Sequence, residues 1–337
     1  MKTTAISSQT VSTAMQLTVT NAQAEISKLQ KEAVTGTYSD AGVVLGTRTS
    51  TSLDYTRESK RLQSIVDSNS VAQQRMDASQ LAMKNMSDSA QTLLNSVIAL
   101  SGNTDSSSLG VAATTANSVL ENFTSYANTA VNGEYLFSGI NTDAQTLNDS
   151  FIADIGSDLK TAFDTRFPDP SAASPTDVAS FLQDYQDNFD WSSWTNASDT
   201  TMSSRISTSE TVSTSTSANA DGFKKLVLAS VISSQLVNHG LGASALSVVN
   251  ETTTKLAGAA IANIDTQRAK IGLSQERVEK ANTYMSAQKT IIDTQLSDLV
   301  GIDTYEASTR LTTLLNQVET SYKITSKIQG LSLVNFI

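Results

Sequence analysis

The chain has 337 residues, 17% of them charged, a formal net charge of -10 and no cysteine. This acidity argues against nucleic-acid binding and against docking on an anionic membrane, because both depend on Lys and Arg. The missing cysteine excludes disulfides and thiolate sites, and no apolar run reaches the roughly 18 residues that span a bilayer. We therefore expect no nucleic-acid partner and no membrane insertion.

The first 35 residues predict a helix, because apolar residues recur at spacings of three and four. This stripe consists of Val11, Met15, Val19, Ala22, Ile26, Leu29 and Ala33. The opening "MKTTAISSQTVSTAMQLTV" has no continuous apolar stretch and does not read as a secretory signal peptide. If the protein works outside the cell, we expect export without a cleaved signal. The glycine-containing linker 36–50 predicts an extended or turn-rich connection.

Residues 62–100 predict a long helix. Positions spaced alternately four and three form one stripe: Ile65, Asn69, Ala72, Met76, Ser79, Met83, Met86, Ala90, Leu93, Val97 and Leu100. This repeat predicts a helix of roughly 58 Å packed along a neighbouring helix. A shorter helix is expected at 107–131, and "GEYLFSGINTD" at 133–143 reads as a turn or strand that closes it.

The middle of the chain, 141–222, differs in composition from its flanks. It holds all three prolines and both tryptophans, and it ends in a stretch rich in Ser and Thr. Rough alternation of Thr and Val there allows strands. We expect a small inserted domain that is α+β or β-rich.

The remaining segments predict a return through helices at 223–238, at 257–299 and near the C-terminus. In the long one, an apolar residue recurs at every seventh position: Ile264, Ile271, Val278, Met285, Ile292 and Leu299. A strict seven-residue repeat predicts pairing over the whole length of roughly 65 Å. The C-terminal stripe is Leu311, Leu315, Val318 and Tyr322, widened by Leu314, Ile324 and Ile328.

The order short helix, long helix, middle, long helix, short helix predicts nested antiparallel pairing. The expected fold is mainly α, a long antiparallel coiled-coil-like helical rod built from both chain ends with the small insert. The predicted division has three parts. Residues 1–45 with 300–337 form a terminal helical assembly domain, 46–140 with 223–299 the long-helix rod, and 141–222 an inserted outer domain.

A search for chemistry finds no site. The lone histidine, His239, lies beside a glycine and is more typical of a helix end than of a catalyst. Gly-rich phosphate loops and Cys/His metal sets are missing from the sequence. The carboxylates of "DPSAASPTD" and "DYQDNFD" lack the spacing of a calcium loop and read as solvated loops. We expect no enzyme activity, no catalytic or metal site and no cofactor.

The two ends need partners. Two short helices share a single seam and are marginal in water, and exposing their apolar residues costs several kcal/mol at roughly 25 cal/mol per Å². We expect other copies or other chains to cover them, with docking onto the chain's own rod as the alternative. The expected assembly interface is Val11, Met15, Val19, Ala22, Ile26, Leu29, Leu311, Leu315, Val318, Tyr322, Ile328, Leu331 and Phe336.

Four stretches resemble the bacterial flagellin superfamily. They are "ISSQTVSTAMQLTVTNAQAEISKLQKEAVTG", "NGEYLFSGINT", "QRAKIGLSQERVEKANTYM" and "IDTYEASTRLTTLLNQVETSYKITSKIQGLSLVNFI". The segment "EYLFSGINT" and the ending "LSLVNFI" are similar to the hook-associated protein 3 family of hook–filament junction proteins. The linker "TYSDAGVVLGTRTS" departs from the superfamily, because it lacks a Pro-Asp-Asp-Pro-like turn.

The resemblance implies an extracellular structural subunit of the flagellum, exported unfolded by the flagellar type III route with an export chaperone. It implies a ring of the chain's own copies between hook and filament, beside a neighbouring hook-associated protein and flagellin. The terminal helices would line the axial tube. Two alternatives stay open: a filament flagellin that self-polymerises, and a carbohydrate-binding or enzymatic insert carried on a helical rod.

Overall fold

The computed structural model describes residues 8–100 and 102–334. Helices dominate this part of the chain, and its strands form two antiparallel two-stranded sheets. The predicted mainly α fold with a small β component is therefore confirmed. The chain divides into two compact units. Unit 1 holds the residues up to 63 and from 286 onward, and unit 2 holds 64–285.

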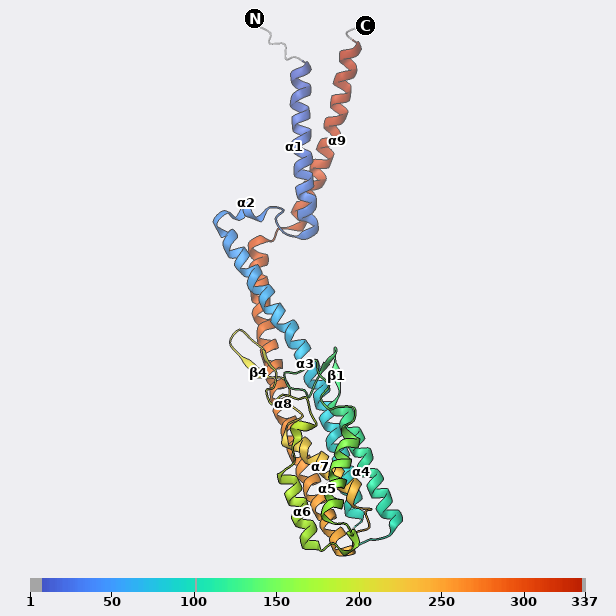
Figure 1. Ribbon diagram of the computed structural model, residues 1–337. Helices are drawn as coiled ribbons and strands as arrows, with labels where there is room; N and C mark the ends of the chain where they lie inside the picture. The colour runs from blue at the N-terminus through green and yellow to red at the C-terminus, as the bar shows by residue number, and fades with distance from the viewer. Residues whose placement is uncertain (1–7, 101, 335–337) are drawn as a thin grey trace. The chain divides into compact units, whose positions relative to one another are not determined.

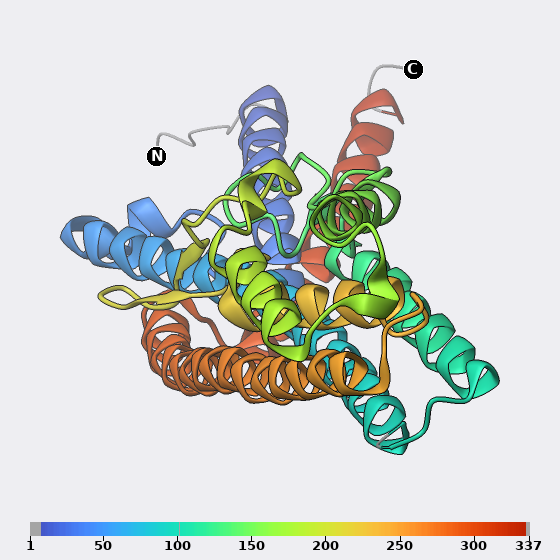
Figure 2. The same cartoon turned by 60° about the horizontal axis from the view of Figure 1, so that its bottom comes forward.

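Unit 2 is built around the paired portions of two long helices, α3 (Thr49–Ala99) and α8 (Ala243–Val300). Figures 1 and 2 show these helices side by side in unit 2. Asn69 Nδ2 donates to Asn282 Oδ1 at 2.7 Å, and Gln80 Nε2 donates to the Arg268 carbonyl at 2.8 Å. A residue further along α3 contacts a residue earlier in α8, so the two helices are antiparallel. This confirms the predicted pairing of the second helix with the second-last.

The seam of this pair follows the predicted stripe. On α3, every stripe residue from Asn69 to Val97 is buried, and so is Leu100, which directly follows the helix. On α8, the residues of the seven-residue repeat are buried from Ile264 to Met285. The helix α3 begins thirteen residues before the predicted start. The prediction missed these first turns because their sequence is polar and has no apolar period.

A second layer of unit 2 consists of α4 (Ser106–Ala127) and α7 (Asp221–Leu236), which pack on each other. The hairpin of β1 (Ala130–Val131) and β2 (Glu134–Tyr135) follows α4. Its two-residue turn, Asn132–Gly133, has positive φ at both positions, as a type I′ turn requires. The predicted strand or turn after this helix is confirmed.

The insert adds α5 (Phe151–Arg166), α6 (Pro175–Asp187), two short 3₁₀ turns at η2 (Pro170–Ala172) and η3 (Trp191–Ser193), and a hairpin of β3 (Ser203–Arg205) and β4 (Thr211–Ser213). Helix α5 packs on α7. The solvated loop predicted at "DYQDNFD" is wrong in its first half, which forms the last turn of α6 and projects Tyr185 onto α5.

Unit 1 contains α1 (Ser8–Thr35) and α9 (Thr304–Val334), the beginning of α3 and the end of α8. Its linker is not extended throughout, because α2 (Ala41–Leu45) and the 3₁₀ turn η1 (Gly46–Arg48) lie in it. The Asp40 side chain caps α2 by accepting a hydrogen bond from the Val43 N–H. The two units do not separate the insert from the rest of unit 2. The division of the chain into three domains therefore stays a prediction.

Candidate assembly interface

The first and last helices of the chain, α1 and α9, pack on each other (Figure 1). Gln23 Nε2 donates to Tyr322 Oη at 3.1 Å, and Thr325 Oγ1 donates to Met15 Sδ at 3.4 Å. The partner numbers run in opposite directions, so the two helices are antiparallel. The predicted pairing of the first helix with the last is confirmed.

Backbone contacts fix the closed end of this pair. The Gly36 carbonyl accepts from the Ile302 N–H at 3.0 Å, and the Val300 carbonyl accepts from the Tyr38 N–H at 3.0 Å. Gly36 has a φ of 66°, a conformation that glycine adopts without strain and that ends α1. The buried Glu32 carboxylate accepts from the Ser39 N–H at 2.9 Å. These bonds set the register from which α1 and α9 extend.

The predicted interface residues fall into four groups. Leu29 is buried, and Val11, Met15, Val19, Ala22, Ile26, Leu311 and Val318 are half-buried. Leu315 and Tyr322 are exposed, by 46% and 54%. Ile328 and Leu331 belong to α9, but their side chains lie outside the described residues, and so does all of Phe336.

The seam of α9 differs from the predicted stripe. The positions that lose the most solvent exposure are Ala307, Leu311, Leu314, Val318, Ser321 and Thr325, spaced alternately four and three. Sequence reasoning missed the polar members because an apolar count skips Ser and Thr. Their regular spacing was the available signal. The seam thus places Leu315 and Tyr322 outside the contact with α1.

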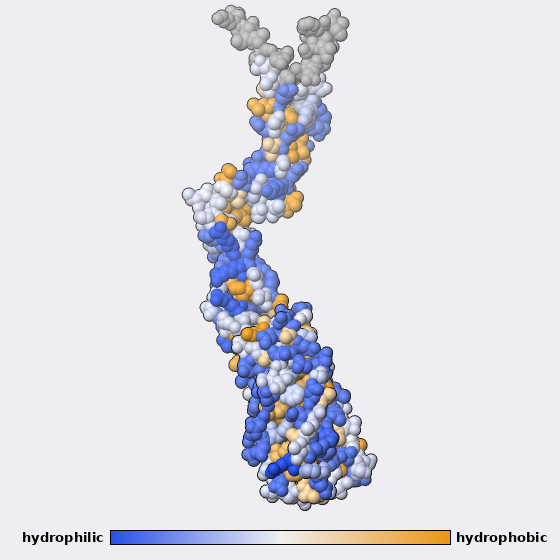
Figure 3. All heavy atoms as spheres, viewed as in Figure 1, coloured by the Kyte–Doolittle hydropathy of each residue, from blue (hydrophilic) through white to orange (hydrophobic). Residues whose placement is uncertain are grey.

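Unit 1 buries little apolar surface. Among its described residues, only Leu29, Leu62 and Ala307 are buried apolar side chains, and the other buried apolar residues belong to unit 2. Figure 3 shows apolar residues at the surface of the α1–α9 pair. Among the described residues of unit 1, the exposed large apolar side chains are Leu17, Val34, Val43, Val44, Leu53, Ile291, Tyr305, Leu315, Tyr322 and Ile324. Leu17, Val34 and Tyr305 were missing from the prediction because each lies off the predicted stripes.

The charges on this surface are paired locally. On α9, Lys323 Nζ lies 2.6 Å from Glu319 Oε1, one helical turn away. The hydrogen bond from Lys323 lowers the pKa of the Glu319 carboxyl. Such exposed pairs contribute little to stability. What distinguishes this surface is uncovered apolar area rather than charge.

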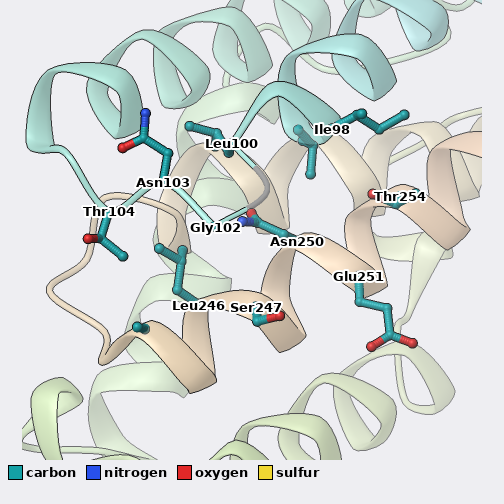
Figure 4. A pocket seen from close by; sticks show the side chains of 12 residues that line it. Ile98, Leu100, Gly102, Asn103, Thr104, Leu246, Ser247, Asn250, Glu251 and Thr254 are labelled. Carbon is teal, nitrogen blue, oxygen red and sulfur yellow. The ribbon is translucent and has the colours of Figure 1, made fainter.

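A cavity of about 420 Å³ in unit 2 lies between the end of α3 and the start of α8 (Figure 4). Leu100, Leu246 and Asn250 are among its lining residues, and it contains neither His nor a basic side chain among those described.

Within the described ranges, no group of three His, Cys, Asp or Glu side chains is arranged to hold a metal ion. No helix of residues 8–100 and 102–334 combines the length and apolarity needed to cross a bilayer.

The lone histidine has a structural contact. His239 follows the end of α7, and its Nε2 atom lies 2.7 Å from Asp164 Oδ1 on α5. Its ring packs edge-on against Phe163, with centroids 5.7 Å apart. The prediction of a residue at a helix end is confirmed, and the contact ties α5 to the end of α7.

Comparisons with known proteins agree with this architecture. Residues 6–142 match the family model of the bacterial flagellin N-terminal helical region, and residues 254–337 match that of the bacterial flagellin C-terminal helical region. Among the curated proteins, none matches the chain at a significant level. One similar solved structure is described as a candidate flagellar hook-associated protein from Vibrio parahaemolyticus. It is 12% identical, its TM-score is 0.55, and the match covers 75% of this chain and 97% of that chain.

Proposed function

The chain belongs to the flagellin superfamily and is a structural subunit of the bacterial flagellum, and we propose that it joins the hook to the filament. The observation that carries this proposal is the α1–α9 pair, whose seam is half-buried and whose outer apolar residues are exposed. Leaving apolar area in water costs roughly 25 cal/mol per Å². Subunit packing at the axis of the flagellum removes that cost.

Two observations favour a junction subunit over a filament flagellin. The "GEYLFSG" segment resembles that of junction proteins and forms a fixed part of unit 2, with Leu136 and Phe137 buried and Phe137 packed on Phe223. The similar solved structure is itself described as hook-associated. Both support the assignment of this chain to the hook–filament junction.

The proposal includes a set of partners. Copies of the chain form a ring through α1 and α9, with a neighbouring hook-associated protein on one side and flagellin on the other. The chain reaches this place by type III export, with a chaperone that protects its ends. The insert faces outward.

A deletion strain tests the junction role. Electron microscopy of its flagella should show hooks that carry no filaments, and the culture medium should contain unassembled flagellin. The wild-type gene supplied in trans should restore filaments. Filaments of normal length on the deletion strain's hooks would refute the proposal.

Seeding distinguishes the alternative, a filament flagellin that polymerises by itself. Purified protein mixed with filament fragments should not grow long homopolymers if it is a junction subunit. Growth of long filaments from this chain alone would favour the alternative.

A further inference from the structure

The insert contains a small pocket of about 230 Å³ between α5, the end of α6 and η3. Its lining residues are Asp158, Tyr185, Asn188, Phe189, Asp190, Ser193 and Trp194. Ligand pockets for drug-sized molecules start at about 300 Å³. This pocket therefore suits a single chemical group.

Three half-buried aromatic side chains form one part of the lining. Tyr185 lies in the last turn of α6 and Phe189 just after the helix, with ring centroids separated by 6.0 Å. Trp194 contacts Phe151 edge-on at 6.4 Å. These contacts hold the rings in place, and each ring keeps part of its surface accessible.

Two carboxylates form the other part. Asp158 Oδ2 accepts a hydrogen bond from Tyr185 Oη at 2.9 Å. Burial, and then this hydrogen bond, raises the pKa of the Tyr185 phenol, so the phenol stays neutral. Hydrogen bonds from Ser192 and Ser193 lower the pKa of Asp190. Among the described residues that line the pocket there is no Lys, Arg or His, so its charge is negative.

We propose that this pocket binds an organic ammonium group. An ammonium is attracted by the faces of Trp, Tyr and Phe and by carboxylates, and the pocket offers both together. An anion would meet two carboxylates without a compensating cation. A neutral saccharide would use the rings and accept or donate hydrogen bonds, but it would draw no benefit from the negative charge.

The two tryptophans provide a built-in probe. Trp191 is buried, and its indole Nε1–H donates to Asn219 Oδ1 at 2.9 Å, whereas Trp194 is half-exposed and lines the pocket. In the full-length protein with ¹⁵N-labelled indoles, each tryptophan gives its own signal. Titration with choline and with Nα-acetyl-lysine methylamide separates a quaternary from a primary ammonium. Methyl glucoside serves as the neutral probe.

A saturable shift of the Trp194 indole signal with an ammonium probe, and a stationary Trp191 signal, is the expected result. The affinity should fall as salt is added, because the attraction is partly electrostatic. Asp158→Asn should weaken binding by roughly fivefold, the effect of one partly exposed ion pair. Trp194→Leu should abolish the binding that calorimetry measures, and an unmoved Trp191 signal would show that the fold of this variant is kept.

Asp187→Asn is the matched control, because it removes a carboxylate of the same insert that does not line the pocket. It should bind as the wild type does. A moved Trp191 signal would reveal that Asp158→Asn disturbs the fold. In that case, calorimetry of Trp194→Phe tests the contribution of the indole ring with both carboxylates still present. Saturation by methyl glucoside instead of an ammonium would overturn the proposal, and so would shifts that stay linear for every probe. The outcome is independent of the junction role, since the experiment uses the unassembled chain.

Discussion

At the scale of single residues, Gly139 explains why the "GEYLFSG" segment needs its second glycine. Its φ is +65°, and a Cβ atom there would lie 2.5 Å from the Ser198 carbonyl oxygen and 2.6 Å from that of Thr200. Both neighbours are backbone atoms, so they cannot rotate away. The segment therefore turns closely against the chain of the insert.

Gly139→Ala should destabilise the protein by about 3 kcal/mol, from the strained φ and the overpacking together. Urea unfolding of the purified chain measures this free energy. Gly110→Ala is the control, because that glycine lies inside α4 with open space around its Cβ position. It should stabilise the protein by about 0.8 kcal/mol through helix propensity. Equal effects of the two changes would contradict the packing described for Gly139.

The Asp164 carboxylate should make stability depend on acid pH. A hydrogen bond from Lys160 and the contact with His239 lower its pKa. A carboxyl with a lowered folded-state pKa contributes stability above its unfolded value, and this contribution is lost as the pH falls through the folded value. Asp164→Asn should therefore lower the Tm at pH 7, with the difference narrowing below about pH 4. A difference in Tm that does not narrow as the pH falls would contradict this expectation.

Periodicity identified individual residues only where their neighbours lie on the paired helices. Asn69 could be placed on the buried stripe of α3 from its spacing alone. Its second hydrogen bond, to the Ile206 carbonyl at 2.9 Å, could not be foreseen, because the partner lies in an irregular loop more than a hundred residues away. The same holds for His239 and Asp164, since pattern analysis places residues on faces and not in contact with a loop.

At the scale of helices, α3 and α9 carry similar spacings with different burial. In α3 the stripe from Asn69 onward lies in unit 2 and is buried, and Asn69 contacts both α8 and the chain at Ile206. In α9 the corresponding stripe packs on α1, and apolar side chains among the described residues remain exposed outside the seam. Spacing predicted both helices, but the degree of burial depends on how many neighbours each helix has.

Met83→Ala in α3 should cost about 2–5 kcal/mol, because this side chain is fully buried and its removal leaves a cavity. Leu81→Ala on the same helix removes a side chain that is 61% exposed. It should change the stability by less than about 0.5 kcal/mol. Chemical denaturation of both variants measures the difference, and similar costs would argue against the burial pattern of α3.

Leu315→Glu in α9 should leave the Tm of the monomer nearly unchanged and prevent assembly, because Leu315 lies outside the seam with α1. Cells carrying the change should lose motility and filaments. Thr320→Glu adds the same charge at another exposed position of α9 without removing an apolar side chain. Cells with Thr320→Glu should assemble more filaments than cells with Leu315→Glu. Motile cells with Leu315→Glu would show that this face is not an interface.

The short helix α2 illustrates the limit of pattern analysis for elements. Its five residues are fewer than two helical turns, so no apolar period can develop in them. The signal that remained was Asp40, a residue type favoured at helix N-caps, three positions before the N–H that it accepts from. In the insert, the expected α+β or β-rich domain allowed for helices, but the positions of α5 and α6 were not predicted.

At the scale of the molecule, the two compact units differ in how complete they are. Unit 2 surrounds α7 with other elements, so residues 226–233 of that helix are buried on all sides. Unit 1 contains helices joined mainly along single seams. Helix pairs of this kind depend on tertiary packing for their stability. We therefore expect neighbouring subunits to cover the apolar surface of α1 and α9.

Hydrogen exchange along the isolated monomer tests this claim most directly. The amides of 8–35 and 304–334 should exchange rapidly, whereas those of 64–99 and 243–285 should be strongly protected, and incorporation into flagella should slow the terminal amides. Terminal amides as protected in the free monomer as those of unit 2 would contradict the account, because the end helices would then be stable without neighbours.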